Sequence, residues 1–182
     1  NNATFSNNFG GDGGGAFYLQ SDIDVNVDLE GTRFLSNTTN GDGGAIETFN
    51  LSGPIDVSLT SSTLSDNQAD GDGGAIKGSA AISINSSTLN DNRSAADGNL
   101  TSRGGGAILV ELGSLNLVNS TLSGNRLMGG EGQGGAIRVE SASVSITHST
   151  FTLNQSPVAG AIFNNGGFVG VENSILAGNT LA

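Results

Sequence analysis

Two four-residue motifs alternate along this chain, and their strict alternation limits the fold more than any other feature of the sequence. The first motif is Phe or Leu followed three residues later by Asn, and it occurs seven times. The second is Gly-Gly-Ala followed by an apolar residue; it occurs five times, with a sixth, variant copy at Ala159–Ile162. Successive copies of the first motif lie 25 to 33 residues apart. An internal period of this length indicates a chain built from repeated structural units.

Between the two motifs, apolar residues recur two positions apart. They stand five and seven residues before the Phe or Leu of the last six copies, as Leu29 and Val27 do before Phe34. The segment from Asp22 to Glu30 alternates apolar and polar residues throughout. Such alternation predicts a strand with one buried face, and no segment shows a helical period. Each repeat is therefore expected to hold about three short strands.

A repeat of this size suits one coil of a parallel β-helix, whose coils stack about 4.8 Å apart. It is too short and irregular for a propeller blade, which needs about 40 residues. We therefore predict an all-β fold: a right-handed, single-stranded parallel β-helix (a solenoid) of about six to seven coils with three short strands per coil. One domain spans residues 1–182. Gly, Asn, Ser and Thr make up nearly half the chain, which fits a narrow solenoid held by backbone pairing.

The repeated polar positions predict structural roles. Stacked Asn side chains can hydrogen-bond amide to amide along the axis, and Asn also tolerates the left-handed backbone of a corner. The expected ladder consists of Asn8, Asn37, Asn67, Asn92, Asn125, Asn154 and Asn179. The Gly before each Ala predicts a corner that needs a positive φ or a close backbone approach. These corner glycines are Gly15, Gly44, Gly74, Gly106, Gly135 and Gly160.

Charge and composition exclude several classes of function. The net charge is −11 and Cys is absent, which argues against nucleic-acid partners and leaves no thiol chemistry. No apolar run is long enough to span a bilayer as a helix, so membrane insertion is not expected. His148 is the single histidine, and its position among variable residues predicts a surface side chain. We expect no catalytic residues and no enzyme.

Acidic turns suggest one cofactor. Gly-Asp-Gly loops occupy the same corner of the first three repeats, and residues 1–75 carry a net charge of −10. Asp12, Asp42, Asp70 and Asp72 could supply the oxygen ligands that Ca²⁺ prefers. The alternative is that Asp and Gly simply form turns and that the charge maintains solubility.

The two tetrapeptides give the chain a resemblance to the polymorphic outer membrane proteins, whose passenger domains repeat Gly-Gly-Ala-apolar and Phe-x-x-Asn. The resemblance covers nearly the whole chain, with Leu replacing Phe at Leu64, Leu89, Leu122 and Leu176. It implies a parallel β-helix on the bacterial cell surface or in the extracellular space, acting in adhesion or self-association.

The expected function is thus an extracellular structural or adhesive element. The sequence starts and ends in the same strand of the repeat, without a polar cap. We expect its partners to be further copies stacked end to end into a filament, or neighbouring repeats of a longer rod, with glycans or a host surface as possible ligands.

The alternatives are a Ca²⁺-dependent binding module and a carbohydrate-active enzyme, which a groove lined by three or more carboxylates would favour. The longest insertion, residues 93–103, predicts a protruding loop whose Asn99 is the best glycosylation candidate.

Overall fold

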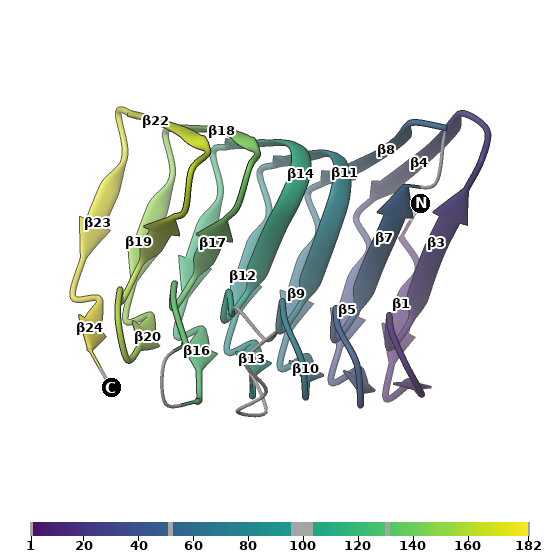
Figure 1. Ribbon diagram of the computed structural model, residues 1–182, viewed down its shortest axis with the longest axis horizontal. Coiled ribbons are helices and arrows are strands. Elements are labelled where there is room, and N and C mark those ends of the chain that lie inside the picture. The colour runs from purple at the N-terminus through teal and green to yellow at the C-terminus, as the bar shows by residue number, and fades with distance from the viewer. Residues whose placement is uncertain (1, 51–52, 96–103, 130–131, 182) are drawn as a thin grey trace.

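The computed structural model describes residues 2–50, 53–95, 104–129 and 132–181. These residues form parallel strands stacked as a β-solenoid, and they contain no helix, so the all-β prediction is confirmed. Within the same ranges no helix offers the length and apolar character needed to cross a membrane. The two ends of the chain lie at opposite ends of the rod (Figure 1). Most of the longest insertion, with Asn99, lies outside the described residues.

Three parallel sheets run along the rod. The Phe/Leu-x-x-Asn motifs form the first sheet, in which each strand pairs with the same motif in the next coil. Its strands are β1 (Thr4–Ser6), β5 (Arg33–Leu35), β9 (Thr63–Ser65), β12 (Thr88–Asn90), β15 (Thr121–Ser123), β19 (Thr150–Thr152) and β23 (Ile175–Ala177). The second sheet has two-residue strands: β2 (Phe9–Gly10), β6 (Thr38–Thr39), β10 (Gln68–Ala69), β13 (Arg93–Ser94), β16 (Arg126–Leu127), β20 (Gln155–Ser156) and β24 (Thr180–Leu181).

The third sheet bends, and it corrects the expected number of strands. In most coils it contributes two strands, one after Gly-Gly-Ala and one in the alternating segment, so a coil has four strands where three were predicted. These are β3 (Phe17–Ser21), β4 (Val25–Glu30), β7 (Ile46–Asn50), β8 (Ile55–Thr60), β17 (Ile137–Val139), β18 (Ser143–Thr147), β21 (Ile162–Asn164) and β22 (Phe168–Glu172). In the two central coils the pair fuses into one long strand: β11 (Ile76–Asn85) and β14 (Ile108–Val118). A register shift between Gly78 and Ser79 lets β11 bend.

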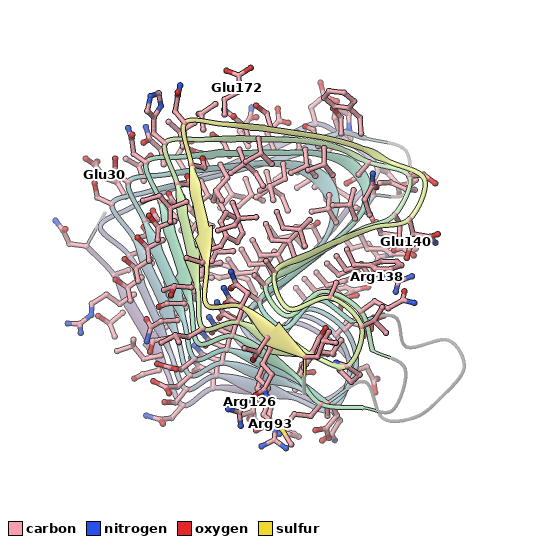
Figure 2. The ribbon with its side chains drawn as sticks, turned by 90° about the vertical axis from the view of Figure 1, so that its left-hand side faces the viewer. Glu30, Arg93, Arg126, Arg138, Glu140 and Glu172 are labelled. Atoms are coloured by element: carbon pink, nitrogen blue, oxygen red, sulfur yellow. The ribbon has the colours of Figure 1, made fainter. Side chains whose placement is uncertain are left out.

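The solenoid is right-handed, as predicted. Figure 2 looks along the rod from its C-terminal end. In the last coil the chain crosses the top in β22, descends in β23 and returns along the bottom in β24, turning counterclockwise as it advances toward the viewer. A path of this kind defines a right-handed coil.

Apolar columns fill the interior. The first-sheet column places Phe34, Leu64, Leu89, Leu122 and Phe151 on top of one another, all fully buried. The alternating segments and the residues after Gly-Gly-Ala add further columns to the same core. Because each strand pairs with its equivalent in the next coil, one repeated residue type creates a continuous core.

Hydroxyl groups stabilise the corner before the first sheet. The main-chain N–H of Ser62 donates to the Ser87 hydroxyl at 3.0 Å, and the N–H of Ser87 donates to the Ser120 hydroxyl at 3.1 Å. The Ser62 hydroxyl in turn donates to the main-chain oxygen of Thr60 at 3.0 Å. The small hydroxyl residues that stand two places before the Phe or Leu of the last six copies therefore satisfy main-chain groups that the corner would otherwise leave unpaired.

Left-handed backbone falls beside the asparagines and not on them. The residues immediately before the seven ladder positions have positive φ: Asn7, Ser36, Asp66, Asp91, Gly124, Leu153 and Gly178. The expectation that ladder asparagines would hold this conformation is wrong. The left-handed residue turns the chain, and its side chain is free to vary because it points away from the core.

Each Gly-Gly pair combines two different requirements. The first glycine, for example Gly73 with φ of 65°, adopts the left-handed conformation. The second glycine, Gly74, needs space: a Cβ there would lie 2.1 Å from the main-chain oxygen of Gly106 in the next coil. The corner glycines thus permit close stacking of backbones, while in the five Gly-Gly pairs the positive φ belongs to the first glycine.

Candidate functional site

The seven asparagines form a continuous ladder through the solenoid. The side-chain nitrogen of each donates to the side-chain oxygen of the next, as from Asn37 to Asn67 at 2.9 Å and from Asn67 to Asn92 at 2.9 Å. The series begins at Asn8 and ends at Asn179. The five internal members are fully buried.

Each internal ladder amide uses its full bonding capacity. The Asn92 side-chain nitrogen also donates to the main-chain oxygen of Leu64 in the preceding coil at 2.9 Å. The Asn92 side-chain oxygen accepts from the side chain and the main-chain N–H of Asn67. Both N–H donors and both acceptor positions are therefore occupied, which is what a buried amide requires.

The four aspartates of the acidic loops do not converge on one point. A carboxylate oxygen of Asp42 accepts from the main-chain N–H of Asp72 at 2.7 Å, and one of Asp72 accepts from the N–H of Gly104 at 2.6 Å. Asp12 lines a pocket, and Asp70 is half-buried. Among the described residues no group of three or more His, Cys, Asp or Glu side chains could hold a metal ion. Asp42 and Asp72 join consecutive coils through main-chain hydrogen bonds.

A row of outward-facing residues follows the apolar residue after each Gly-Gly-Ala. Strand pairing aligns one residue per coil, and we call this set the outer row: Tyr18, Glu47, Lys77, Leu109, Arg138 and Phe163. The alternate residues of these strands pack in the core. Yet Glu47, Lys77, Leu109 and Arg138 are buried, because the wall carrying the row is indented, as Figure 2 shows around Arg138 and Glu140.

A charged cluster occupies the outer row in the second and third coils. The Lys77 ammonium lies 3.1 Å from a Glu47 carboxylate oxygen, 3.6 Å from Asp42 and 3.7 Å from Glu111. It also lies 5.8 Å from the centre of the Phe49 ring. Glu47 is only 5% exposed and Lys77 8%. Three carboxylates therefore lie close to one cation; Glu47 is buried with Lys77, whereas the side chains of Asp42 and Glu111 are 33% and 32% exposed.

Burial, for Glu47, and the surrounding carboxylates, for Lys77, shift the pKa values of both groups upward. Burial raises the pKa of Glu47 above 4.5; Lys77 opposes this shift, while Asp42 and Glu111 add to it. Burial lowers the pKa of Lys77, but the nearby carboxylates, Glu47 first, raise it further, so the net change is upward from 10.5. Three carboxylates stabilise the charged form of Lys77. The charged form of Glu47 is stabilised by Lys77 alone and is repelled by Asp42 and Glu111.

A second ion pair lies further along the row. The Arg138 guanidinium pairs with Glu140 and donates to Gln133, and it lies 5.2 Å from the centre of the Phe163 ring. Asn165 donates to the second oxygen of Glu140 at 2.8 Å. Each buried cation of the row thus has both a carboxylate and an aromatic ring as neighbours.

Motif analysis of the sequence missed this row. The signal was present, because the position after each Gly-Gly-Ala-apolar motif holds Glu47 in one repeat and Lys77 in the next. Opposite charges at equivalent positions of adjacent repeats predict pairing once strands stack in register. Their burial could not be anticipated, since alternation alone places the row in solvent.

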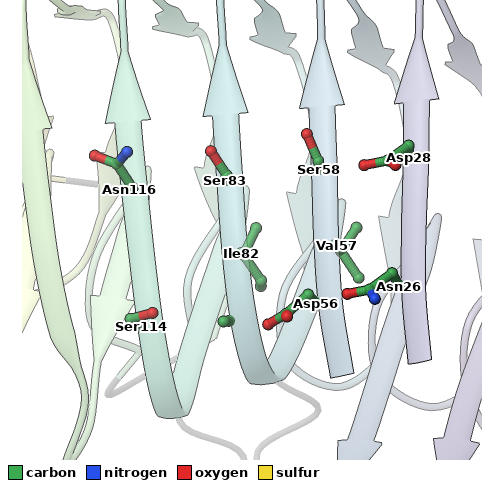
Figure 3. A pocket seen from close by; sticks show the side chains of 10 residues that line it. Asn26, Asp28, Asp56, Val57, Ser58, Ile82, Ser83, Ser114 and Asn116 are labelled. Atoms are coloured by element: carbon green, nitrogen blue, oxygen red, sulfur yellow. The ribbon is translucent and has the colours of Figure 1, made fainter. Parts of the chain in front are cut away.

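A shallow cavity of about 390 Å³ lies on the outer face of β4, β8, β11 and β14. Short side chains line it, with Asp28 and Asp56 on neighbouring strands as its only acids (Figure 3). Two carboxylates fall short of the three expected of a carbohydrate-active groove, and no basic residue lines the cavity.

Comparison with known proteins identifies the repeat. Residues 61–79 match the model of the Chlamydia polymorphic membrane protein repeat. The match contains Leu64-x-x-Asn67 and the Gly-Gly-Ala-Ile motif that ends at Ile76, followed directly by Lys77. No curated protein and no solved structure matches the chain. The chain is therefore a parallel β-solenoid, and its residues 61–79 carry one repeat of the polymorphic membrane protein type.

Proposed function

We propose that this chain is a segment of an extracellular surface rod whose coils continue by end-to-end stacking. The observation that carries the proposal is the polarity of the asparagine ladder. Every rung donates from one coil to the next, so the series leaves the Asn8 side-chain oxygen at one end and the main-chain N–H of Asn179 at the other. An acceptor at one end complements a donor at the other, which favours head-to-tail, non-closing contacts.

The outer surface of the last coil supports this arrangement. In the last coil two apolar side chains of the core columns, Val171 and Leu176, are exposed. Their strand partners in the preceding coil, Ile146 and Phe151, are fully buried, because the last coil covers them. A further coil would cover Val171 and Leu176, supplied either by neighbouring repeats of a longer chain or by a second copy.

Electron microscopy of the 182-residue chain over a range of concentrations tests self-association. We expect filaments with an axial repeat near 30 Å, from six to seven coils spaced about 4.8 Å apart. Leu176→Glu should prevent assembly, because it places a charge on the stacking surface. Leu153→Glu is the matched control, since Leu153 is exposed at a corner of the preceding coil. Monomers of the unaltered chain at every concentration would contradict the proposal.

Surface display and adhesion are supported by the repeat, which is named for a membrane protein of Chlamydia. A rod with a net charge of −11 remains soluble outside the cell while its corners and walls contact other molecules. Antibody labelling of intact, unpermeabilised cells of the source organism should detect the chain. Labelling only after permeabilisation would argue against display.

We propose no catalytic role for the cluster around Lys77, although it contains the three carboxylates that a carbohydrate-active enzyme would need. Asp42, Glu47 and Glu111 all lie within 4.0 Å of the same ammonium, so they neutralise a fixed charge. The chain should release no sugars or unsaturated products from acidic polysaccharides, and steady release that Glu47→Gln abolishes would restore the enzyme alternative.

A further inference from the structure

A cavity of about 400 Å³ opens beside the outer row at its N-terminal end. Asp12, Gly13, Tyr18 and Glu47 line it. Tyr18 of β3 and Glu47 of β7 are paired across the sheet, and Asp12 and Gly13 come from the corner that precedes β3. The lining of the cavity therefore contains two carboxylates and an aromatic ring. None of the four described residues that line it is basic.

Glu47, which lines this cavity, has one carboxylate oxygen without a hydrogen-bond partner among the described residues. One carboxylate oxygen accepts from Lys77, but the other, Oε2, is buried and has no hydrogen-bond partner among the described residues. Gly13 makes room for it: a Cβ at Gly13 would lie 1.8 Å from Oε2. A buried carboxylate oxygen without a partner is energetically costly, and a donor that carries positive charge would relieve the cost.

The rest of the outer row shows what such a donor would look like. Lys77 pairs with the Glu47 carboxylate and lies 5.8 Å from the centre of the Phe49 ring. Arg138 pairs with the Glu140 carboxylate and lies 5.2 Å from the centre of the Phe163 ring. The cavity offers the same pair of groups, a carboxylate from Glu47 and a ring from Tyr18, with Asp12 in addition. Glu47 already pairs with Lys77 through Oε1, but no basic residue lines the cavity among the described residues.

We propose that this cavity binds an organic cation, the ammonium or guanidinium group of a lysine or arginine side chain of a partner protein. The cation would contact Glu47 Oε2 and Asp12 and lie over the Tyr18 ring, as cations lie over aromatic rings in general. The net charge of −10 over residues 1–75 would draw a basic segment toward this end of the rod. A free polyamine has the same chemistry, so the test distinguishes the two sources.

Tyr18 provides the measurement. It is the only tyrosine, and the chain has no tryptophan, so intrinsic fluorescence above the phenylalanine background comes from this one ring. The full chain is titrated with a lysine-rich peptide free of aromatic residues and, separately, with spermidine, at constant ionic strength. Saturable change in Tyr18 emission with the peptide supports the proposal, and a tighter response to spermidine assigns the site to free polyamines. Binding of both by calorimetry without any change in emission would place the cation elsewhere and overturn it.

Three variants separate a specific site from general attraction. Asp12→Asn should weaken binding by about threefold, as loss of an exposed ion pair does. Gly13→Ala should weaken it by at least about tenfold without altering the charge, because the new Cβ occupies the position of Glu47 Oε2. Asp28→Asn, an exposed acid on another wall, is the matched control and should leave the affinity unchanged. If Asp28→Asn and Asp12→Asn weakened the affinity equally and Gly13→Ala left it unchanged, binding would depend only on the net charge of the chain. That result would overturn the proposal.

Discussion

The side-chain nitrogen of Asn92 donates to the side-chain oxygen of Asn125, one coil further along, at 3.0 Å. The two residues are 33 positions apart and both are fully buried. This contact spans the longest interval between ladder positions, so the insertion between the two coils leaves the ladder unbroken.

Replacement of Asn92 should therefore destabilise the rod strongly. Asn92→Ala removes bonds to Asn67, Asn125 and Leu64 and leaves buried main-chain groups unsatisfied. We expect a loss of about 3 kcal/mol or more in the free energy of unfolding, from costs of about 1–3 kcal/mol for each unsatisfied group. Urea denaturation measures it, with the exposed Asn116→Ala as a control that should stay near the unaltered stability. Equal midpoints for the two variants would show that the ladder is dispensable.

The Lys77 cluster predicts a coupled pair of substitutions. Lys77→Met leaves the buried Glu47 carboxylate without its cation, and loss of one partner from a buried ion pair typically costs about 3–5 kcal/mol. Adding Glu47→Leu should recover most of that loss, since apolar replacements of similar volume can substitute for a buried pair. Denaturation of the single and double variants gives the coupling energy, and additive effects would rule the interaction out.

Alkaline pH should weaken the protein through the same group. The pKa of Lys77 is raised in the folded state from a reference of 10.5, so its proton is bound more tightly than in the unfolded chain. Its stabilising contribution is complete below about pH 10.5 and is lost as the pH rises through the higher folded-state pKa. Lys77 is the only lysine.

Melting temperatures at increasing alkaline pH measure this effect. The comparison uses Lys77→Arg, whose guanidinium stays charged at these pH values, and both proteins carry Tyr18→Phe to remove phenol ionisation. The lysine protein should lose stability more steeply with pH. Parallel profiles would show that the titration of Lys77 does not contribute.

Corner glycines should tolerate no side chain. Gly74→Ala places a Cβ 2.1 Å from the main-chain oxygen of Gly106. Because the main chain cannot move aside without breaking the pairing between coils, we expect the free energy of unfolding to fall by about 1–3 kcal/mol. Gly11→Ala is the control, because a Cβ there meets no atom within 4 Å. Thermal unfolding should separate the two variants clearly, whereas similar melting temperatures would mean that the corner can relax.

Calcium should leave the melting temperature unchanged. Asp42 and Asp72 use carboxylate oxygens to accept main-chain N–H groups of the next coil, so a calcium ion would have to compete for these oxygens. Differential scanning calorimetry with Ca²⁺ and with a chelator tests this expectation. A Ca²⁺-dependent rise would favour the Ca²⁺-binding alternative, because a ligand that binds only the folded state raises its stability.

The repeated sequence determined the coil, its core columns and the positions that stack. When the same residue type returns at the same place in every repeat, stacking the repeats brings those residues together whatever the details of the turns. Phe34 over Leu64 and Asn67 over Asn92 follow from the repeat alone. Even the variant motif at Ala159–Ile162 fits, since Gly160 keeps the close approach to Thr180 that the corner needs.

Only the tertiary structure decided where the backbone turns and which outward residues are buried. Positive φ fell on Asp66 and Asp91 beside the ladder, because the turn precedes the residue whose side chain must point inward. Burial of Glu47 and Lys77 depends on the indented wall, whose shape is set by the bends between three sheets. Sequence periodicity reports which face of a strand a residue occupies. It does not predict how strongly the wall curves. That curvature buries outward-facing residues of the outer row that alternation alone would place in solvent.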